Sequence, residues 1–461
     1  MCPLPPVMPS KPVMPSDASG FEGVEKRLEL LFAPAPAQLR GACLLVVRNG
    51  LAGSRQLFGR LRPCTKVVAL GLVSPCFAPQ THAALFVNAP LCLSPRAGLR
   101  TLSRQQLDGF LQVAQCSIVA SSHSDAFDAY VLSESSLFVY ADKLIIKTCG
   151  TTALLKALPT ALQLASSVGA HLLRVRYSRA CFKYPAVQPA PHRSWAEECR
   201  FLDGVLGARG VAHVLGDGSG LKWHLYSLDA RPVAPGTPSV SVATIEALDS
   251  GRTKASAGSS DNSPTFTLEI CMTQLDASAA AAFMFGSDMP TARQVTESSG
   301  IASLFPEDMV IDDFVFNPCG YSMNGLLGSG LATIHVTPEA RCSYASVEIS
   351  GHATGVFRPD KLVAAACAVF KPGALCVALT VDGCGDVPAE WSAIQLPVGF
   401  KEAKGATSTV GLPAGGQVLH MNSVLAKPTA KAPSKTKTRA AVGQVPPSAV
   451  AVAPAMALEV M

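Results

Sequence analysis

The chain has 461 residues, a net charge of +5, 48% hydrophobic residues and only 15% charged residues. A chain of this length buries one large hydrophobic core or two medium ones. Its longest apolar helix-like stretch, residues 157–173, is too short and too polar to span a membrane. The Pro-rich start of the chain, Met1 to Gly20, contains no basic segment followed by an apolar run, so we predict no secretory signal and no membrane partner.

The cysteines and the basic residues exclude further classes of protein. The 15 cysteines are odd in number and form no C-x-x-C pair, which favours reduced thiols in a cytoplasmic protein over disulfides or a zinc site. The basic residues between 427 and 439 have no acidic neighbours and are surrounded by Pro and Ala, as in a solvated tail. This segment contains no aromatic residue, so we predict no nucleic-acid partner.

The chain begins with a low-complexity leader, residues 1–19, in which Pro-Val-Met-Pro-Ser occurs twice. The stretch 33–95 shows no sustained period and no acidic residue, so we interpret it either as an atypical insertion or as sequence that is absent from the working protein, and we favour the second interpretation. A Ser/Gly/Thr-rich segment at 236–263 is predicted to be a surface insertion. We therefore predict one folded domain over 20–403 that carries both insertions, followed by a disordered Pro/Ala/Lys tail over 404–461.

The predicted domain contains two groups of strands separated by helices. Residues 21–31 have strand or short-helix character, and β-rich runs with turns between 116 and 148 predict an antiparallel meander. Leucines on one face predict a helix over 151–173, kinked at Pro159. A second strand group lies between 223 and 381. Strands grouped in this way are typical of an α+β fold with helices outside antiparallel sheets. Further helices are predicted at 104–113, after an N-cap at Ser103, at 194–206 and at 359–370.

The most informative local feature is the dipeptide Glu134-Ser135, in the segment 130–139. The Ser135 hydroxyl can attack the Glu134 carbonyl and convert the amide to an ester, and loss of the Ser135 α-proton then expels the Glu134 carboxylate. Hydrolysis of the resulting dehydroalanine leaves a pyruvoyl group, whose ketone can form a Schiff base with a substrate amine and withdraw electrons. Ser-rich tetrapeptides more commonly form caps or turns, so this interpretation depends on the surrounding sequence.

Other segments offer the groups that such a reaction needs. Cys149 ends a β run before a Gly-Thr-Thr turn, where it is either a proton donor or a buried, inert thiol. The turn-dense segment 316–325 offers an aromatic ring and a hydroxyl. His335 lies on a polar strand face, as a core histidine or as a functional one. With Glu339 it lacks the helical spacing and the third ligand of a metal site, so we predict no metal.

Taken together and in this order, four blocks resemble eukaryotic S-adenosylmethionine decarboxylase, the pyruvoyl enzyme of polyamine synthesis. The blocks are 130–139, 147–152, 316–325 and 333–339, within a resemblance that runs over about 20–32 and 99–400. The resemblance implies a self-cleaving cytoplasmic carboxy-lyase. This enzyme converts S-adenosylmethionine to CO₂ and decarboxylated S-adenosylmethionine, the aminopropyl donor for spermidine and spermine biosynthesis.

The resemblance also implies roles in self-cleavage. Ser135 becomes the pyruvoyl group, the covalent cofactor, when the bond after Glu134 breaks to give two associated chains, 1–134 and 135–461. His335 takes the Ser135 α-proton, and Ser322 hydrogen-bonds the intermediate. Cys149 then serves catalysis by protonating the former α-carbon of the substrate.

For the substrate, S-adenosylmethionine, the resemblance implies a pocket around the cleavage site. Phe21 and Phe316 stack on the adenine, and their ring faces suit a sulfonium cation. Glu339 binds the ribose hydroxyls. The Leu132 backbone and Glu134 line the pocket, and Glu22 and Glu25 assist processing and catalysis.

The family fold is a four-layer αββα sandwich of two antiparallel sheets, which the two strand groups fit. Animal members are stimulated by putrescine through a buried acidic cluster. Glu269 and Glu348 match two of its acids, whereas Thr265 replaces a third carboxylate. Arg27 stands at a position that is aliphatic in the stimulated enzymes and basic in plant-type ones. A guanidinium among carboxylates can replace the charge of the diamine. We therefore predict a plant- or alga-like enzyme that putrescine does not stimulate.

Two other functions remain open. A catalytically inactive paralogue that binds and activates a true decarboxylase is expected to lack Ser135, Cys149 or His335, and all three are present. A generic cytosolic thiol enzyme needs a partner for Cys149 that the sequence alone does not reveal. The expected oligomeric state is a monomer or a homodimer.

Overall fold

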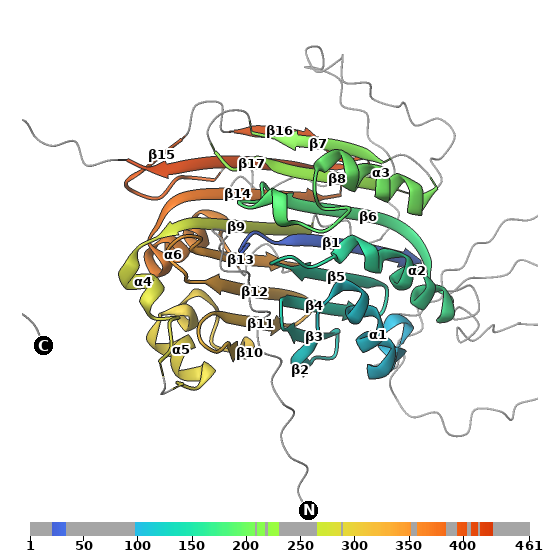
Figure 1. The fold of residues 1–461 in the computed structure, drawn as a ribbon, viewed down its shortest axis with the longest axis horizontal. Helices are drawn as coiled ribbons and strands as arrows, with labels where there is room; N and C mark the ends of the chain where they lie inside the picture. Colours follow the sequence, from blue (N-terminus) through green and yellow to red (C-terminus); the bar gives the residue numbers. More distant parts are fainter. Residues whose placement is uncertain are drawn as a thin grey trace, which may run out of the picture. The chain divides into compact units, whose positions relative to one another are not determined.

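The computed structural model describes residues 21–33, 97–207, 210–216, 220–229, 265–286, 289–351, 357–383, 394–402, 407–413 and 415–426. The predicted leader, nearly all of the 33–95 insertion, the 236–263 insertion and the segment after 426 lie outside these residues. Up to Leu425 the described residues belong to one compact unit built on two antiparallel sheets (Figure 1).

Sheet A contains eight strands. In spatial order they are β2 (Ile118–His123), β3 (Phe127–Leu132), β4 (Ser135–Tyr140), β5 (Lys143–Thr148), β1 (Lys26–Ala33), β6 (His171–Ala180), β8 (Trp223–Asp229) and β7 (Val211–Leu215). β2 to β5 pair antiparallel in chain order, which confirms the predicted meander. β1 lies between β5 and β6, so the first described segment is part of the sheet interior.

Sheet B contains nine strands and repeats this topology. In spatial order it has β10 (Val310–Val315), β11 (Tyr321–Leu327), β12 (Gly330–Thr337), β13 (Tyr344–Ser350), β9 (Thr265–Leu275), β14 (Pro372–Asp382), β17 (Gly416–Leu425) and β15 (Phe400–Glu402), with β16 (Ser408–Gly411) paired on β17. In both sheets a four-strand meander lies beside a strand from earlier in the chain. The two halves of the fold therefore echo each other.

Side chains from the two sheets pack together, and helices cover the outer faces. Phe127 and Phe138 of sheet A contact Leu326 and Leu331 of sheet B in an interior cluster. The outer face of sheet A packs against α1, α2 and α3, and the outer face of sheet B packs against α4, α5 and α6 (Figure 1). These helices are α1 (Arg104–Ala114), α2 (Leu158–Ser167), α3 (Trp195–Leu206), α4 (Ala277–Ala281), α5 (Ala292–Ser298) and α6 (Pro359–Phe370). This arrangement confirms the α+β class and the αββα layers.

Local capping signals explain three of the helices that the sequence predicts. Ser103 precedes α1 and forms a capping box with Gln106. Ser194 caps α3, and α6 starts at Pro359, where a missing N–H is tolerated. Short 3-10 turns complete the helical elements: η2 (Gly98–Thr101), η3 (Leu154–Ala157), η4 (Pro185–Val187) and η5 (Ile301–Leu304).

The helix predicted over 151–173 is confirmed only in its middle part, whereas its bounds and the kink at Pro159 are wrong. The segment forms η3 and α2, and the chain re-enters sheet A as β6 at His171. Pro159 lies in the first turn of α2, where its missing N–H breaks no helical hydrogen bond. The proline therefore starts the helix and does not kink it.

The predicted end of the domain at 403 is also wrong. β17 pairs along nearly its whole length with β14, so sheet B extends to Leu425. Three of the buried positions of β17 are polar, His420, Asn422 and Ser423. The strand consequently lacks the apolar alternation that a sequence pattern needs to reveal it.

Within the described part of the chain, no helix is long and apolar enough to cross a membrane. The same residues contain no cluster of three or more His, Cys, Asp or Glu side chains suited to hold a metal ion.

Candidate active site

The Glu134–Ser135 bond lies in a tight hairpin between β3 and β4. Leu132 ends β3 and pairs with Ser135, the first residue of β4, so Ser133 and Glu134 form the turn. The Ser133 amide donates to the Ser117 carbonyl over 2.8 Å and fixes the turn to the adjacent strand. Ser135 has φ = 135°, a backbone conformation that costs a non-glycine residue about 1–3 kcal/mol. The fold thus stores strain at the candidate cleavage residue.

The Ser135 hydroxyl lies between the two sheets and is only 2% exposed. Its Oγ donates to Glu25 Oε1 at 3.0 Å and lies 3.2 Å from both ring nitrogens of His335. Glu25 precedes β1 of sheet A, whereas His335 belongs to β12 of sheet B. Three segments that are distant in sequence therefore bring a hydroxyl, a carboxylate and an imidazole together.

Hydrogen bonds fix His335 on both sides of its ring. Its Nδ1 contacts the Glu25 carboxylate, and its Nε2 lies 2.8 Å from Ser136 Oγ. Ser136 also donates to Asn324 Oδ1 at 2.6 Å and contacts Thr333. Burial opposes ionisation of Glu25, but the charges of Lys147 and His335 outweigh it and hold the pKa of Glu25 well below its usual range. Glu25 is therefore an ionised acceptor.

Ser322 lies on the same sheet face as the histidine. It is buried on β11 and pairs directly across the ladder with His335 on β12. Directly opposed residues in an antiparallel pair project from the same face. The structure therefore places Ser322 beside the group that contacts Ser135, although its predicted role stays a prediction.

Cys149 follows β5 and contacts the residue before the candidate cleavage bond. Its amide donates to the Glu134 carbonyl over 3.0 Å, and its Sγ lies 3.5 Å from the same oxygen. The thiol is also 3.7 Å from Glu134 Oε2. Gly150 has φ = 62°, and a Cβ there would lie 3.1 Å from both Glu134 Oε2 and the Phe21 ring. Only glycine leaves room for these groups at this turn.

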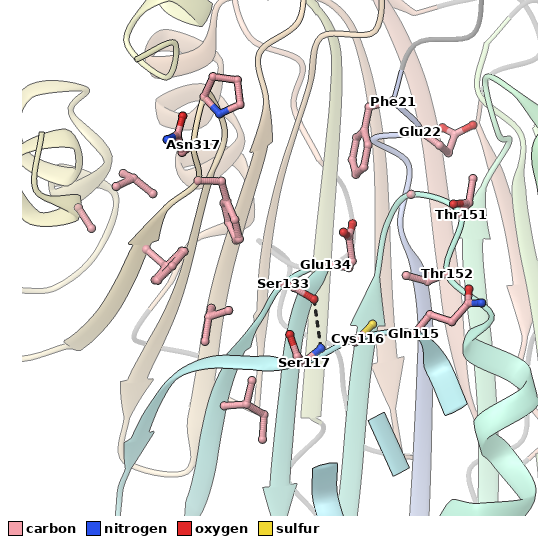
Figure 2. A pocket seen from close by; sticks show the side chains of 18 of the residues that line it. Phe21, Glu22, Gln115, Cys116, Ser117, Ser133, Glu134, Thr151, Thr152 and Asn317 are labelled. Carbon is pink, nitrogen blue, oxygen red and sulfur yellow. Dashed lines mark hydrogen bonds between the residues drawn. The ribbon is translucent and has the colours of Figure 1, made fainter. Parts of the chain in front are cut away.

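The hairpin faces a cavity of about 2350 Å³ formed by the described residues. The residues that line it include Phe21, Glu22, Glu134, Phe316 and Glu339. Figure 2 shows the Phe21 ring and the Glu134 side chain beside each other, with Glu22 and Thr151 close by. The Leu132 side chain is fully buried and does not line the cavity. The sequence-predicted substrate residues therefore converge here, except for the side chain of Leu132.

Burial raises the pKa of Glu22 above its ordinary value, although hydrogen bonds from the Tyr184 and Val24 amides oppose this effect. The Tyr184 amide donates to Glu22 Oε2 over 2.7 Å, which fixes the carboxyl group at the cavity wall. Glu22 therefore offers a positioned acid group beside Phe21.

A buried cluster of charges continues from Glu25 along the space between the sheets. Arg27 contacts Glu348 at 2.9 Å and Glu29 at 3.0 Å. Lys147 contacts Glu348 at 2.9 Å and Glu25 at 3.4 Å, so it links these two carboxylates. Arg27 thus lies among carboxylates, and sequence reasoning missed the linking role of Lys147.

Glu269 pairs across the ladder with Glu348 in this cluster. Burial, followed by the charge of Glu348, raises the pKa of Glu269 to about 7, while Arg27 and Lys147 oppose the shift. Thr265, by contrast, is exposed at the start of β9.

Sequence reasoning also missed Ser136 and Asn324 next to the catalytic candidates. Ser136 follows the candidate cleavage residue, and Asn324 lies two residues beyond Ser322 on one strand face. Strand alternation therefore offered a signal for Asn324. Nothing local distinguished Ser136 from the other serines of the hairpin.

Three kinds of comparison relate this chain to known proteins. A family model described as adenosylmethionine decarboxylase matches residues 83–405, a range that begins after β1. The S-adenosylmethionine decarboxylase proenzyme of Oryza sativa subsp. japonica is 42% identical over 307 residues, which cover 65% of this chain and 70% of that protein. The proenzyme of Ipomoea batatas is 40% identical over 342 residues, which cover 73% and 85%.

A solved structure titled "Crystal structure of Trypanosoma brucei AdoMetDC-delta26 monomer" is 21% identical, with a TM-score of 0.44, and the match covers 63% of this chain and 99% of that one. The family model matches well over half of the chain, and the plant relatives match over most of their own length. The chain belongs to the adenosylmethionine decarboxylase family.

Proposed function

We propose that this chain is a self-cleaving, pyruvoyl-dependent decarboxylase that converts S-adenosylmethionine to CO₂ and decarboxylated S-adenosylmethionine for polyamine synthesis. One observation carries the proposal. Ser135, held at φ = 135° in a hairpin, has its hydroxyl 3.0 Å from the ionised Glu25 and 3.2 Å from His335. Strain, an acceptor for the proton and an imidazole meet at the bond that the family cleaves.

In the first step, Ser135 Oγ attacks the Glu134 carbonyl carbon while its proton moves to Glu25. The Cys149 amide, 3.0 Å from the Glu134 oxygen, stabilises the negative charge that develops there. The C–N bond then breaks, the Ser135 nitrogen takes up the proton, and an ester replaces the amide. Relief of the strain at Ser135 favours the ester.

In the second step, His335 takes the Ser135 α-proton, and the bond from Cβ to the Glu134 carboxylate oxygen breaks. Glu25 orients the ring through Nδ1, and Nε2 serves as the base when the ring is neutral. Ser322, across the ladder from His335, stabilises the intermediate. Addition of water to the dehydroalanine releases ammonia and leaves the pyruvoyl group.

The residues around Ser135 suit this group, because Glu134, Cys149 and His335 contact or border the position where its ketone forms. When present, the pyruvoyl ketone withdraws electrons from a bound amino acid and so assists loss of CO₂. Cys149 holds a proton at Sγ, and we propose that this proton is transferred to the α-carbon of the substrate. Protonation at another carbon would instead inactivate the enzyme.

The cavity wall offers contacts for each part of the substrate. Phe21 and Phe316 supply rings for the adenine, and Glu339 supplies a carboxylate for the ribose hydroxyls. Glu22 and Glu134 add acidic groups that attract the sulfonium and ammonium charges. Leu132 ends β3 at the hairpin, and its backbone contributes to the wall of the substrate site there.

The two chains stay associated because their strands alternate in sheet A. Cleavage after Glu134 leaves β1, β2 and β3 on the first chain. β1 still lies between β5 and β6 of the second chain, and β3 still pairs with β4. Separating the chains would break these ladders and expose the core.

The charged cluster supports activity without putrescine. Arg27 already holds Glu348 and Glu29, so a positive charge is built into the space between the sheets. Rates with and without millimolar putrescine are expected to be equal, and a clear stimulation contradicts this part of the proposal. We also propose a cytoplasmic location, which fits the reduced thiols that the sequence predicts and is checked by cell fractionation.

Intact-mass analysis of the purified full-length chain tests the function. The expected result is one fragment that ends at Glu134 and a second that starts with a ketone at position 135, together with release of labelled CO₂ from carboxyl-labelled S-adenosylmethionine. Ser135→Ala is expected to stay whole and inactive, and Ser133→Ala, its matched control in the same turn, is expected to cleave. A wild-type chain that stays whole and releases no CO₂ instead favours the inactive paralogue.

A further inference from the structure

Lys26 is a buried lysine that the proposed reaction does not yet use. It lies on β1 with no exposed surface, on the face opposite to Arg27. Its Nζ donates to the Gly150 carbonyl at 3.0 Å and to Gln188 Oε1 at 3.2 Å, and it lies 5.3 Å from the centre of the Phe182 ring. These contacts hold the ammonium in one position.

The buried charge of Lys26 is not neutralised by a salt bridge. Among the described residues, no carboxylate lies within ion-pair distance of its Nζ, in contrast to Arg27 and Lys147, which each contact two acids. A buried charge without a counter-ion is costly, so its retention indicates a function. The ionisable groups that interact with it electrostatically are Cys149, Glu22, Cys116 and Glu198, together with His192.

The geometry connects Lys26 to Cys149 in two ways. Lys26 pairs across the ladder with Thr148, the residue before Cys149. It also binds the carbonyl of Gly150, the residue after Cys149, and Gln188 Nε2 supports the same carbonyl at 3.3 Å. Cys149 therefore lies between Thr148, which pairs with Lys26 in the sheet, and Gly150, whose carbonyl accepts from the Lys26 ammonium. Its electrostatic attraction to the thiolate form of Cys149 is the largest that Lys26 experiences.

We propose that Lys26 is a positioning residue for Cys149, whose ammonium fixes the Gly150 turn and stabilises the thiolate that remains after Cys149 donates its proton. This inference rests on the proposed role of Cys149 as a proton donor. The proton leaves Sγ for the α-carbon of the substrate, the electron pair stays on sulfur, where the Lys26 charge attracts it, and solvent later restores the proton. A positive charge close to a thiol makes it a stronger acid.

The test measures how fast iodoacetamide alkylates Cys149 in the full-length protein, by mass spectrometry of the peptide that contains it. Alkylation reports the thiolate population and needs neither substrate nor the pyruvoyl group. Lys26→Met removes the charge, and Lys26→Arg retains it. Lys143→Met is the matched control, because Lys143 lies at the other end of β5, roughly 17 Å along the strand, with its ammonium over the Tyr140 ring.

At pH 7, Lys26→Met is expected to alkylate at Cys149 roughly tenfold more slowly than the wild type, while Lys26→Arg and Lys143→Met keep a near wild-type rate. A folded Lys26→Met protein with the wild-type rate overturns the proposal. An uncut wild-type chain contradicts the proposed function, whereas the alkylation rates still test this contact. Normal cleavage with unchanged alkylation contradicts this inference alone.

The wild-type protein gives a second test if Lys26→Met does not fold. Burial lowers the pKa of Lys26 to about 8, so the ammonium loses its proton in the pH range in which thiols ionise. Between about pH 7 and 9 the Cys149 alkylation rate is therefore expected to rise less steeply in the wild type than in Lys26→Arg, because the lysine charge disappears as the thiolate forms and the arginine charge does not. Equal slopes in the two proteins overturn the proposal.

Discussion

Two buried polar regions lie on opposite faces of sheet A. The processing centre faces sheet B and consists of Glu25, Ser135, Ser136, Asn324, Thr333 and His335. The outer network faces α3, and its members are Tyr177, Arg179, His192, Glu198 and His224. In both regions a buried glutamate binds a histidine, so burial and hydrogen bonding do not by themselves make a site reactive.

The two regions differ in backbone strain and in the groups that their hydrogen bonds surround. In the outer network, Glu198 accepts from Tyr177 at 2.6 Å and pairs with Arg179 at 2.7 Å and His192 at 2.8 Å. The Leu155 amide donates to the other nitrogen of His192, so this histidine ties η3 to the sheet. In the processing centre the same kinds of group surround a serine with a positive φ next to a turn carbonyl. The first region stabilises the fold, whereas the second poises one bond for cleavage.

The largest effect is expected from loss of the histidine in the processing centre. His335→Ala removes the base for the α-proton and is expected to slow release of the two fragments by at least roughly 100-fold. The ester then accumulates, and hydroxylamine splits the chain after Glu134, as gel analysis and mass spectrometry show. His123→Ala, at a partly exposed site beside Asp128, is the control and is expected to cleave normally. Rapid cleavage of the His335→Ala chain contradicts the proposed role.

The outer network is expected to affect stability but not cleavage. Glu198→Gln leaves Arg179 buried without its counter-charge and is expected to cost roughly 3–5 kcal/mol of unfolding free energy, measured by denaturant titration. Cleavage into two chains should still go to completion. Glu25→Gln, a matched change in the processing centre, is expected to slow cleavage. If Glu198→Gln and Glu25→Gln change the cleavage rate equally, the functional distinction between the two regions is wrong.

A smaller, pH-dependent effect is expected for Glu269 in the charge cluster. Its folded pKa of about 7 exceeds the ordinary 4.5, so its contribution to stability is full below about pH 4.5 and is lost as the pH rises to 7. Glu269→Gln stays neutral. It should therefore gain stability relative to the wild type, on the order of 2 kcal/mol, between pH 5 and 8. Denaturant midpoints at both pH values check this, and a constant difference contradicts the shift.

The smallest effect is expected outside both regions. Ser103→Ala removes the capping box of α1 and is expected to cost about 1 kcal/mol of unfolding free energy without changing cleavage. Thermal unfolding measures the loss, and the intact mass after expression provides the control. A cleavage defect in this variant indicates that α1, which lines the cavity with Asp108 and Gln112, also positions the hairpin.

Features with a local cause could be predicted from the sequence. The starts of α1 and α3 follow from Ser103 and Ser194, because an N-cap acts on the amides two or three residues away. The meander follows from short β-rich runs with turns between them. Pro159 misled the prediction, because a proline is tolerated in the first turn and disruptive in the interior, and only the neighbouring structure distinguishes the two.

The sequence by itself determined the reactive dipeptide, the family blocks and the presence of Cys149 and His335, because these depend on residue type and order. Only the tertiary structure decided what these residues contact. It placed β1 at the centre of sheet A, which brings Glu25 to Ser135 and Lys26 to the Cys149 turn. It also joined Lys147 to Glu25 and Glu348. Such contacts depend on strand register and on the packing of two sheets, and neither is encoded within a short segment of the chain.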